Sequence, residues 1–302
     1  MPSFLLRLWI VIGPLIYLLI CASIAALVAF PIFKLLHGDN LSLYRSIVSR
    51  GGQVILVLGI PLFFSWKNVS ASSILGFSRL FPVQFLGGLF LGGITLGLHV
   101  FALIEFDVRG FIWSKLATLD FDFLAVKSLI TGLSVGLLEE VLFRGALLGF
   151  LMRASSGAWA IAISSFYYAA LHFIGTLWTT DLSLVNWTTG FEIALDGFSH
   201  LTSAPLDSFL GLFTAGVFLG SIRVFFPSSL GFCIGIHAGW VFIIQSANNT
   251  TYPISGSPFN FLVGPHDGYV GFMSTAWLWL IIAALWMFKS FRRPLFRPEL
   301  VD

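Results

Sequence analysis

Two adjacent carboxylates and an arginine lie in the middle of an apolar run. The stretch Leu-Leu-Glu139-Glu140-Val-Leu-Phe-Arg144-Gly falls about halfway along a hydrophobic segment that we place at 123–151. Apolar side chains would pack such a helix at far lower cost, because burying charged groups in a membrane or a core is expensive. The cluster therefore indicates a functional site.

Helical spacing separates the two glutamates. Residues four apart share one face of a helix, so Glu140 is predicted to pair with Arg144 as a neutral structural clamp. Glu139 points about 100° away from Glu140. We therefore expect Glu139 to face a cavity and to be the carboxylate that does chemistry.

Two histidines lie within later apolar runs, where each can meet Glu139. They belong to the stretches Phe166-Tyr167-Tyr168-Ala-Ala-Leu-His172 and Gly235-Ile-His237-Ala-Gly-Trp240-Val241. A carboxylate with two imidazoles in a wet membrane cavity can activate water for hydrolysis. The same three side chains can bind zinc, and they can relay protons or ions in a transporter. The residues alone leave these three chemistries open.

The composition indicates a protein that spans a membrane many times. Of 302 residues, 57% are hydrophobic and 10% are charged, and the chain contains 33 Phe and 10 Trp. Soluble domains carry roughly 25% charged residues. The net charge of +2 gives no basic footprint for nucleic acid. Cys21 and Cys233 both fall inside apolar runs, so we expect no disulfide framework.

A membrane core of roughly 30 Å takes about 20 helical residues to cross. Apolar runs of that length predict an all-α, polytopic membrane protein with eight transmembrane helices, and no linker divides the chain, so one membrane domain covers 1–302. The predicted spans are 8–33, 46–65, 82–104, 123–151, 157–178, 207–226, 229–247 and 270–289.

Positive charges predict the orientation. The C-terminal tail holds Lys289, Arg292, Arg293 and Arg297, a cluster that favours the cytoplasmic side. With eight spans both termini are then cytoplasmic. The connection 179–206, which lacks Lys and Arg, falls outside and forms either an interfacial helix or an aromatic loop that rests on the headgroups.

The other polar residues of the apolar runs have simpler interpretations. His99 is expected to make a hydrogen bond between helices, and Lys127 lies close enough to a membrane face to extend its amine to water. The stretch Gly132-Leu-Ser134-Val-Gly136 matches G-x-S-x-G, but a nucleophile elbow needs a strand-turn-helix and this segment is predicted to be helix. Small residues at a helix contact explain it as well as a serine protease of the rhomboid type.

The ordered motifs resemble those of a known family. E-E-x-x-x-R, an aromatic-x-x-x-His and a later His are similar to the CPBP family of intramembrane proteases, also called the Abi or CAAX-protease family. The family includes CAAX prenyl endopeptidases of the Rce1 type and bacterial relatives, some of them tied to bacteriocin self-immunity. The resemblance covers a catalytic core at 120–245, and residues 236–242 are similar to a bacterial subgroup.

The resemblance implies roles for individual residues. Glu139 would be the water-activating base, and His172 and His237 would assist it. Glu140 and Arg144 carry over as the second glutamate and the arginine of the first motif.

Two positions depart from the family's pattern. Tyr168 replaces the usual Phe of the second motif. Val241 replaces the Asn that often follows the third-motif His by four residues, so a helper for the oxyanion is missing or comes from elsewhere.

We therefore expect an intramembrane endopeptidase that cleaves a membrane-anchored protein or peptide, in the inner membrane of a bacterium. A catalytically inactive partner or immunity protein is the alternative, and a transporter is a weaker one. We expect activity without a bound metal. If a metal binds, its ligands would be Glu139, His172 and His237.

Overall fold

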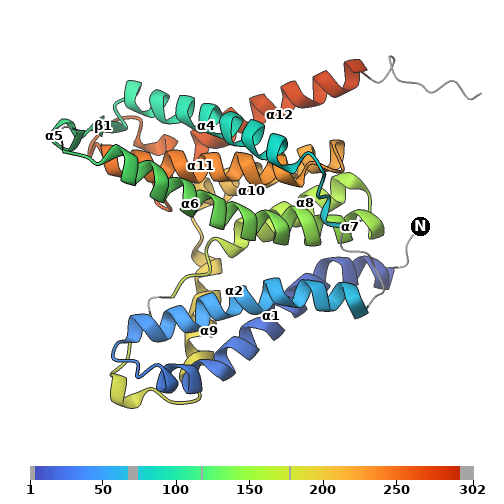
Figure 1. The fold of residues 1–302 in the computed structure, drawn as a ribbon, viewed down its shortest axis with the longest axis vertical. Coiled ribbons are helices and arrows are strands. Elements are labelled where there is room, and N and C mark those ends of the chain that lie inside the picture. Colours follow the sequence, from blue (N-terminus) through green and yellow to red (C-terminus); the bar gives the residue numbers. More distant parts are fainter. Residues whose placement is uncertain (1–3, 67–73, 117, 177, 293–302) are drawn as a thin grey trace, which may run out of the picture. The chain divides into compact units, whose positions relative to one another are not determined.

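The computed structural model describes residues 4–66, 74–116, 118–176 and 178–292 (Figure 1). Arg293 and Arg297 of the predicted cytoplasmic tail lie outside these residues. The described chain is mostly helical, and six of its helices are long and apolar enough to cross a membrane. The protein is an all-α, polytopic membrane protein, as predicted, and the count of eight spans stays a prediction. The membrane-capable helices are Val11–Leu35, Phe81–Glu105, Phe121–Ala154, Leu206–Phe225, Leu230–Thr250 and Phe272–Ser290.

The chain forms two compact units. The first unit comprises Met1–Leu75 and Gly145–Ala204, and the second comprises Gly76–Arg144 and Pro205–Asp302. The first unit contains the helices α1 (Phe4–Leu35), α2 (Leu41–Trp66), α7 (Leu148–Ala154), α8 (Gly157–Leu171) and α9 (Thr189–Ser199), with short 3-10 turns at Leu182–Leu184 and His200–Ser203.

Helices α1 and α2 of the first unit lie side by side, and α9 packs against both (Figure 1). Phe33 of α1 and Tyr44 of α2 meet edge to face, with ring centroids 5.1 Å apart, and Ile193 of α9 joins their buried cluster. Ser156 is the N-cap of helix α8, and its hydroxyl accepts a hydrogen bond from the backbone N–H of Trp159. This cap fixes the start of the helix that leads to His172.

The second unit contains Glu139 and Glu140, the two adjacent glutamates of the predicted site. Its helices are α4 (Phe81–Glu105), α5 (Trp113–Leu116), α6 (Phe121–Glu140), α10 (Leu206–Phe225), α11 (Leu230–Thr250) and α12 (Phe272–Arg292), with a 3-10 turn at Asn260–Leu262. A small antiparallel ribbon pairs β1 (Arg109–Phe111) with β2 (Thr251–Pro253), in the register Gly110 opposite Tyr252. The π-helical segment Val141–Leu147 continues α6 and contains the boundary between the two units.

Helix α11 packs closely on α4 through glycines on both helices. A side chain at Gly88 or Gly92 of α4 would meet the backbone of α11. A side chain at Gly235 or Gly239 of α11 would meet the backbone of α4. Small residues at a spacing of four allow helix backbones to approach closely inside a membrane, where packing rather than the hydrophobic effect drives helix association.

The opposite side of α11 meets α6 in the same manner. A Cβ at Gly132 would clash with the carbonyl oxygen of Ala238, and one at Gly136 would lie 3.0 Å from the carbonyl oxygen of Ile234. The hydroxyl of Ser134 donates to the carbonyl of Ile130 within the helix. Gly132-Leu-Ser134-Val-Gly136 is therefore a helix contact, and no nucleophile elbow forms there.

A buried polar cluster ties the ribbon to the helix ends in the second unit. Arg109 of β1 donates to the Thr251 hydroxyl at 2.9 Å and stacks on the Tyr269 ring, 4.2 Å from its centroid. Burial raises the pKa of Tyr269, and its hydroxyl donates to Asn248. His99 donates through Nε2 to the carbonyl of Tyr269 at 2.9 Å. His99 thus makes a structural hydrogen bond, as expected, but to the connection before α12.

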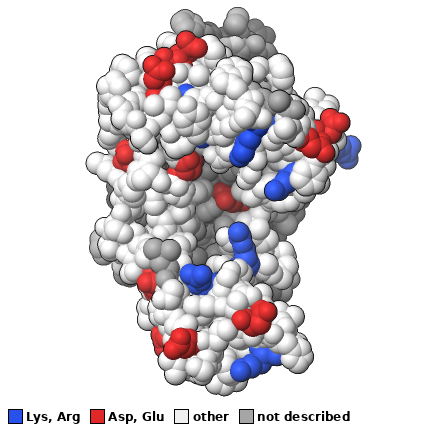
Figure 2. All heavy atoms as spheres, turned by 90° about the vertical axis from the view of Figure 1, so that its left-hand side faces the viewer, with Lys and Arg blue, Asp and Glu red and all other residues white. Residues whose placement is uncertain are grey.

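Figure 2 shows acidic and basic side chains scattered over one face of the molecule, with uncharged surface between them. Leu86, Phe90 and Phe101 of α4 are between 59% and 72% exposed. In a membrane protein such exposed apolar side chains face lipid.

Two predicted segments differ in detail from the structure, and a third contains a helix, one of its two predicted forms. Helix α8 ends at Leu171 rather than near residue 178, and its 15 residues are too few for the length required of a span. The predicted helix 123–151 is interrupted by the π-helical turn, although the helical path continues to Ala154. Within 179–206 the chain forms α9, so this connection is helical rather than a plain aromatic loop.

The contact between α4 and α11 yields a first prediction. Gly92→Ala places a methyl group against the α11 backbone and should lower the stability of the folded protein by about 1–3 kcal/mol. Gly93→Ala is the matched control, because nothing lies within 4 Å of its Cβ position on the same helix. The melting temperature in detergent should fall for Gly92→Ala and stay equal or rise slightly for Gly93→Ala. Equal melting temperatures for the two variants would refute the close packing.

Candidate active site

The two glutamates end helix α6 and face different surroundings. Ser128, Gly132, Gly136 and Glu140 are buried at intervals of four residues, so this stripe faces the interior of the second unit. The Glu140 side chain is 0% exposed, whereas that of Glu139 is 23% exposed. The difference agrees with the helical phase predicted from the sequence. Glu140 is enclosed, and Glu139 reaches an accessible space.

Arg144 lies one turn further along, within the π-helical segment. Its Nη1 donates to Glu140 Oε1 at 3.0 Å, and the arginine side chain is 1% exposed. The predicted Glu140–Arg144 pair is confirmed. The π-helical turn itself was not predicted, because a single wide turn leaves little trace in the hydrophobic periodicity. Such turns occur frequently at functional sites.

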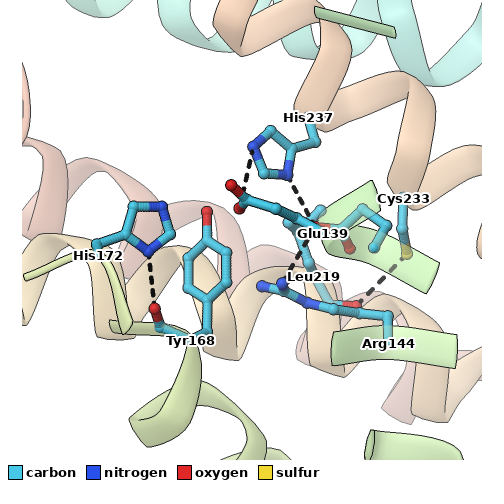
Figure 3. Close-up of polar contacts among 8 residues, drawn as sticks. Glu139, Arg144, Tyr168, His172, Leu219, Cys233 and His237 are labelled. Carbon is cyan, nitrogen blue, oxygen red and sulfur yellow. Dashed lines mark hydrogen bonds and ion pairs between the residues drawn. The ribbon is translucent and has the colours of Figure 1, made fainter. Parts of the chain in front are cut away.

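His237 of α11 contacts both carboxylates (Figure 3). Its Nδ1 lies 2.8 Å from Glu140 Oε1, and its Nε2 lies 3.8 Å from Glu139 Oε2. A carboxylate oxygen accepts, so Nδ1 carries a proton and donates it to Glu140. The 3.8 Å separation is within ion-pair range but too long for a direct hydrogen bond. Glu140 therefore fixes the imidazole with Nε2 directed at Glu139.

This second role of Glu140 was missed in the sequence. Spacing along one helix predicts the Arg144 contact, but residues 140 and 237 are 97 positions apart. Nothing in the local pattern indicates that the carboxylate also holds a histidine of another helix. When both glutamates are carboxylates and His237 is neutral, this group of side chains, with Arg144, carries one more negative than positive charge. A second proton on His237 would balance that charge.

Tyr168 and His172 lie at the end of α8 in the first unit. His172 is the C-cap of that helix, and its Nδ1 donates to the carbonyl of Tyr168 at 2.7 Å. The two rings meet edge to face, with centroids 4.5 Å apart. The aromatic residue of the second motif thus orients the histidine that follows it by four positions. In the neutral ring, Nε2 is the unprotonated nitrogen.

Two further groups have no direct role in this chemistry. Cys233 is fully buried one turn before His237, is free, and directs its sulfur to the carbonyl of Leu219 at 3.6 Å. Cys21 is also free and buried. Among the described residues, no group of three or more His, Cys, Asp and Glu side chains converges as a metal site.

The chain matches a family model. Residues 121–243 match the model described as Rce1-like, type II CAAX prenyl endopeptidase Rce1-like. The matched segment begins with the first residue of α6 and ends within α11, so it contains Glu139, His172 and His237. No curated protein and no solved structure matches the chain.

The buried pair yields a second prediction, on stability. Glu140→Gln removes the carboxylate that faces Arg144 and His237, and breaking a buried ion pair from one side costs about 3–5 kcal/mol. The variant should melt early in detergent. Replacing both partners, as Glu140→Gln with Arg144→Met, should recover part of the melting temperature because no charge is then buried without its counter-charge.

Glu139→Gln is the control for this series. Its side chain is partly exposed and keeps its shape, so the variant should melt like the wild type. Early melting of Glu139→Gln with a stable Glu140→Gln would reverse the assignment of the two glutamates.

Proposed function

Residues 121–243 form a domain of the Rce1-like family of type II CAAX prenyl endopeptidases, and from this premise we propose that the protein is an intramembrane endopeptidase that uses glutamate-activated water. Membership in the CPBP family, which the motifs predicted, is confirmed for this segment. The family and the apolar helices indicate a membrane-embedded protease that acts on a protein substrate.

The observation that carries the proposed mechanism is the difference between the two glutamates. Glu140 is enclosed and bonded to Arg144 and His237, whereas Glu139 is partly exposed beside His237 Nε2. A general base needs access to water, and a structural clamp does not. We therefore assign the base to Glu139.

In the proposed reaction Glu139 removes a proton from water, and the hydroxide oxygen adds to the carbonyl carbon of the scissile peptide bond. The carbonyl oxygen becomes an oxyanion. Protonated His237 donates a hydrogen bond to it through Nε2, while Glu140 accepts from Nδ1 and balances the imidazolium charge. The proton held by Glu139 then passes to the departing amine nitrogen as the C–N bond breaks. From the order of the family motifs we propose His172 as a second histidine that assists Glu139, as His237 does.

The proposed substrate is a membrane-anchored protein or peptide. Prenylated CAAX tails are the substrate class of the family's eukaryotic members, but residues 236–242 resemble a bacterial subgroup, which favours a different membrane-anchored peptide. We propose a bacterial inner membrane with both termini cytoplasmic, supported by the Lys and Arg cluster of the C-terminal tail.

The presence of Val at position 241 favours the alternative function, that of a catalytically inactive partner or immunity protein. An Asn often occupies this position in the family, and an apolar side chain there supplies no hydrogen bond to an oxyanion. The two functions differ in what Glu139 does. An inactive partner would keep its function when this carboxylate is neutralised.

A third prediction tests the enzyme. Glu139→Gln should accumulate normally, while turnover falls by about 100-fold or more because the general base is lost. Proteomics of membrane-protein termini in a wild-type and a Glu139→Gln strain measures this, and termini present only in the wild type identify the substrate. Identical termini in the two strains, with a normal phenotype of the variant, would support the inactive partner.

A fourth prediction concerns the third motif. If His237 alone holds the oxyanion, Val241→Asn should leave turnover similar or raise it, since a correctly placed donor is worth about 2.7–4 kcal/mol. Val241→Ala is the control for the lost volume. Cleavage of a substrate found by the proteomics, per folded molecule, measures the effect. A large loss in folded Val241→Asn would instead mean that the apolar side chain packs against the substrate.

A further inference from the structure

Trp240 lies three residues after His237 on α11, and its ring stands beside the imidazole. The two ring centroids are 6.3 Å apart, with planes inclined by 49°. The indole also packs against Phe218 of α10, at 5.9 Å between centroids. Trp240 is 9% exposed, so it fills the interior next to the histidine rather than a lipid-facing surface.

A hydrogen bond across the helix interface sets the plane of this indole. Trp240 Nε1 donates to the hydroxyl of Thr95 on α4 at 3.0 Å. The Thr95 hydroxyl gives its own proton to the carbonyl of Gly92 at 3.1 Å, and so presents a lone pair to the indole. Both side chains are buried within the second unit, where water offers no alternative partner.

The imidazole of His237 needs support on its flank. Glu140 holds one edge of the ring through Nδ1, and the side chains that pack against the ring limit how far it can tilt about that contact. The opposite nitrogen must stay directed at Glu139, from which it is 3.8 Å away. A rigid indole beside the ring restricts this tilt. Catalytic geometry is sensitive to such changes, because a misplacement of about 1 Å can cost 100-fold in rate.

We propose that Trp240, fixed by Thr95, is a positioning residue that keeps His237 Nε2 directed at Glu139. The inference rests on the proposed function for its effect on turnover, but the position of the imidazole can be measured without any substrate. Thr95 acts on His237 indirectly, because its hydroxyl contacts the indole of Trp240 and not the imidazole.

The molecule contains a matched control. Trp277 of α12 also donates its indole N–H to Thr95, but to the backbone carbonyl, again at 3.0 Å. Trp240→Phe and Trp277→Phe therefore each remove one indole hydrogen bond to the same residue. Thr95→Val removes the hydroxyl, and with it the bond from Trp240 and the bond to the Gly92 carbonyl, but keeps the backbone carbonyl that Trp277 uses. Thr95→Ser retains a hydroxyl that can make both bonds.

The first measurement is NMR of protein carrying ¹⁵N-labelled histidine in detergent, with the His237 ring signals assigned by their loss in His237→Gln. Thr95→Val should shift or broaden these signals, whereas Thr95→Ser and Trp277→Phe should leave them unchanged. Trp240 is still present in Thr95→Val, so a change there reports the orientation of the rings and not the loss of the indole.

The second measurement is cleavage of a substrate from the terminal proteomics. Turnover at saturating substrate should fall about 10- to 100-fold in Trp240→Phe and Thr95→Val, with KM little changed. Thr95→Ser should restore turnover, and Trp277→Phe should keep it. If Thr95→Val fails to fold, the comparison of Trp240→Phe with Trp277→Phe decides the question.

Two results would overturn the inference. One is folded Thr95→Val with wild-type His237 signals. The other is an equal loss of turnover in Trp240→Phe and Trp277→Phe. Failure of the proposed function looks different, because Glu139→Gln would then change no termini while the NMR comparison still reports how His237 is held.

Discussion

One carboxylate oxygen, Glu140 Oε1, is the contact on which the rest of the site depends. It accepts from Arg144 at 3.0 Å and from His237 at 2.8 Å, and all three side chains are buried. Charged groups inside a membrane are tolerated when they are paired, and removing one partner is costly. The pairing therefore constrains the end of α6, the π-helical turn after it and the rotation of α11 about its axis. Any helix arrangement that separated these three groups would leave a charge exposed to an apolar interior.

Glycine packing makes that arrangement geometrically available. Gly132 and Gly136 bring α6 against the backbone of α11, and Gly235 and Gly239 bring the other side of α11 against α4. Close backbone contact on two sides leaves α11 little freedom to rotate or slide. The glycine contacts thus define the position of α11 and of its His237. In the core of a soluble protein, close packing of complementary side chains defines a single arrangement in the same way. The same stripe of α6 that brings the helices together ends in Glu140.

The two histidines are oriented by the same device from different partners. His237 gives its Nδ1 proton to a carboxylate, and His172 gives its Nδ1 proton to the carbonyl of Tyr168. Each neutral ring is then held in the tautomer whose unprotonated nitrogen is Nε2. For His237 this matters in the proposed mechanism, because a second proton can then be gained only at the nitrogen that faces Glu139. Replacement of the usual Phe by Tyr168 does not disturb the His172 bond, since that bond uses the backbone carbonyl.

The sequence by itself determined the membrane class, most of the helices, the Glu140–Arg144 pair and the opposite surroundings of Glu139 and Glu140. These features depend on composition and on the 3.6-residue period, both of which are local. The family could also be read from the order of the motifs along the chain. Tertiary structure alone decided that Glu140 holds His237, that α8 ends before His172 and that Thr95 orients Trp240. The two contacts between helices join residues up to 145 positions apart. They depend on how far one helix is rotated and shifted against another, and no periodicity within a single helix encodes that relation.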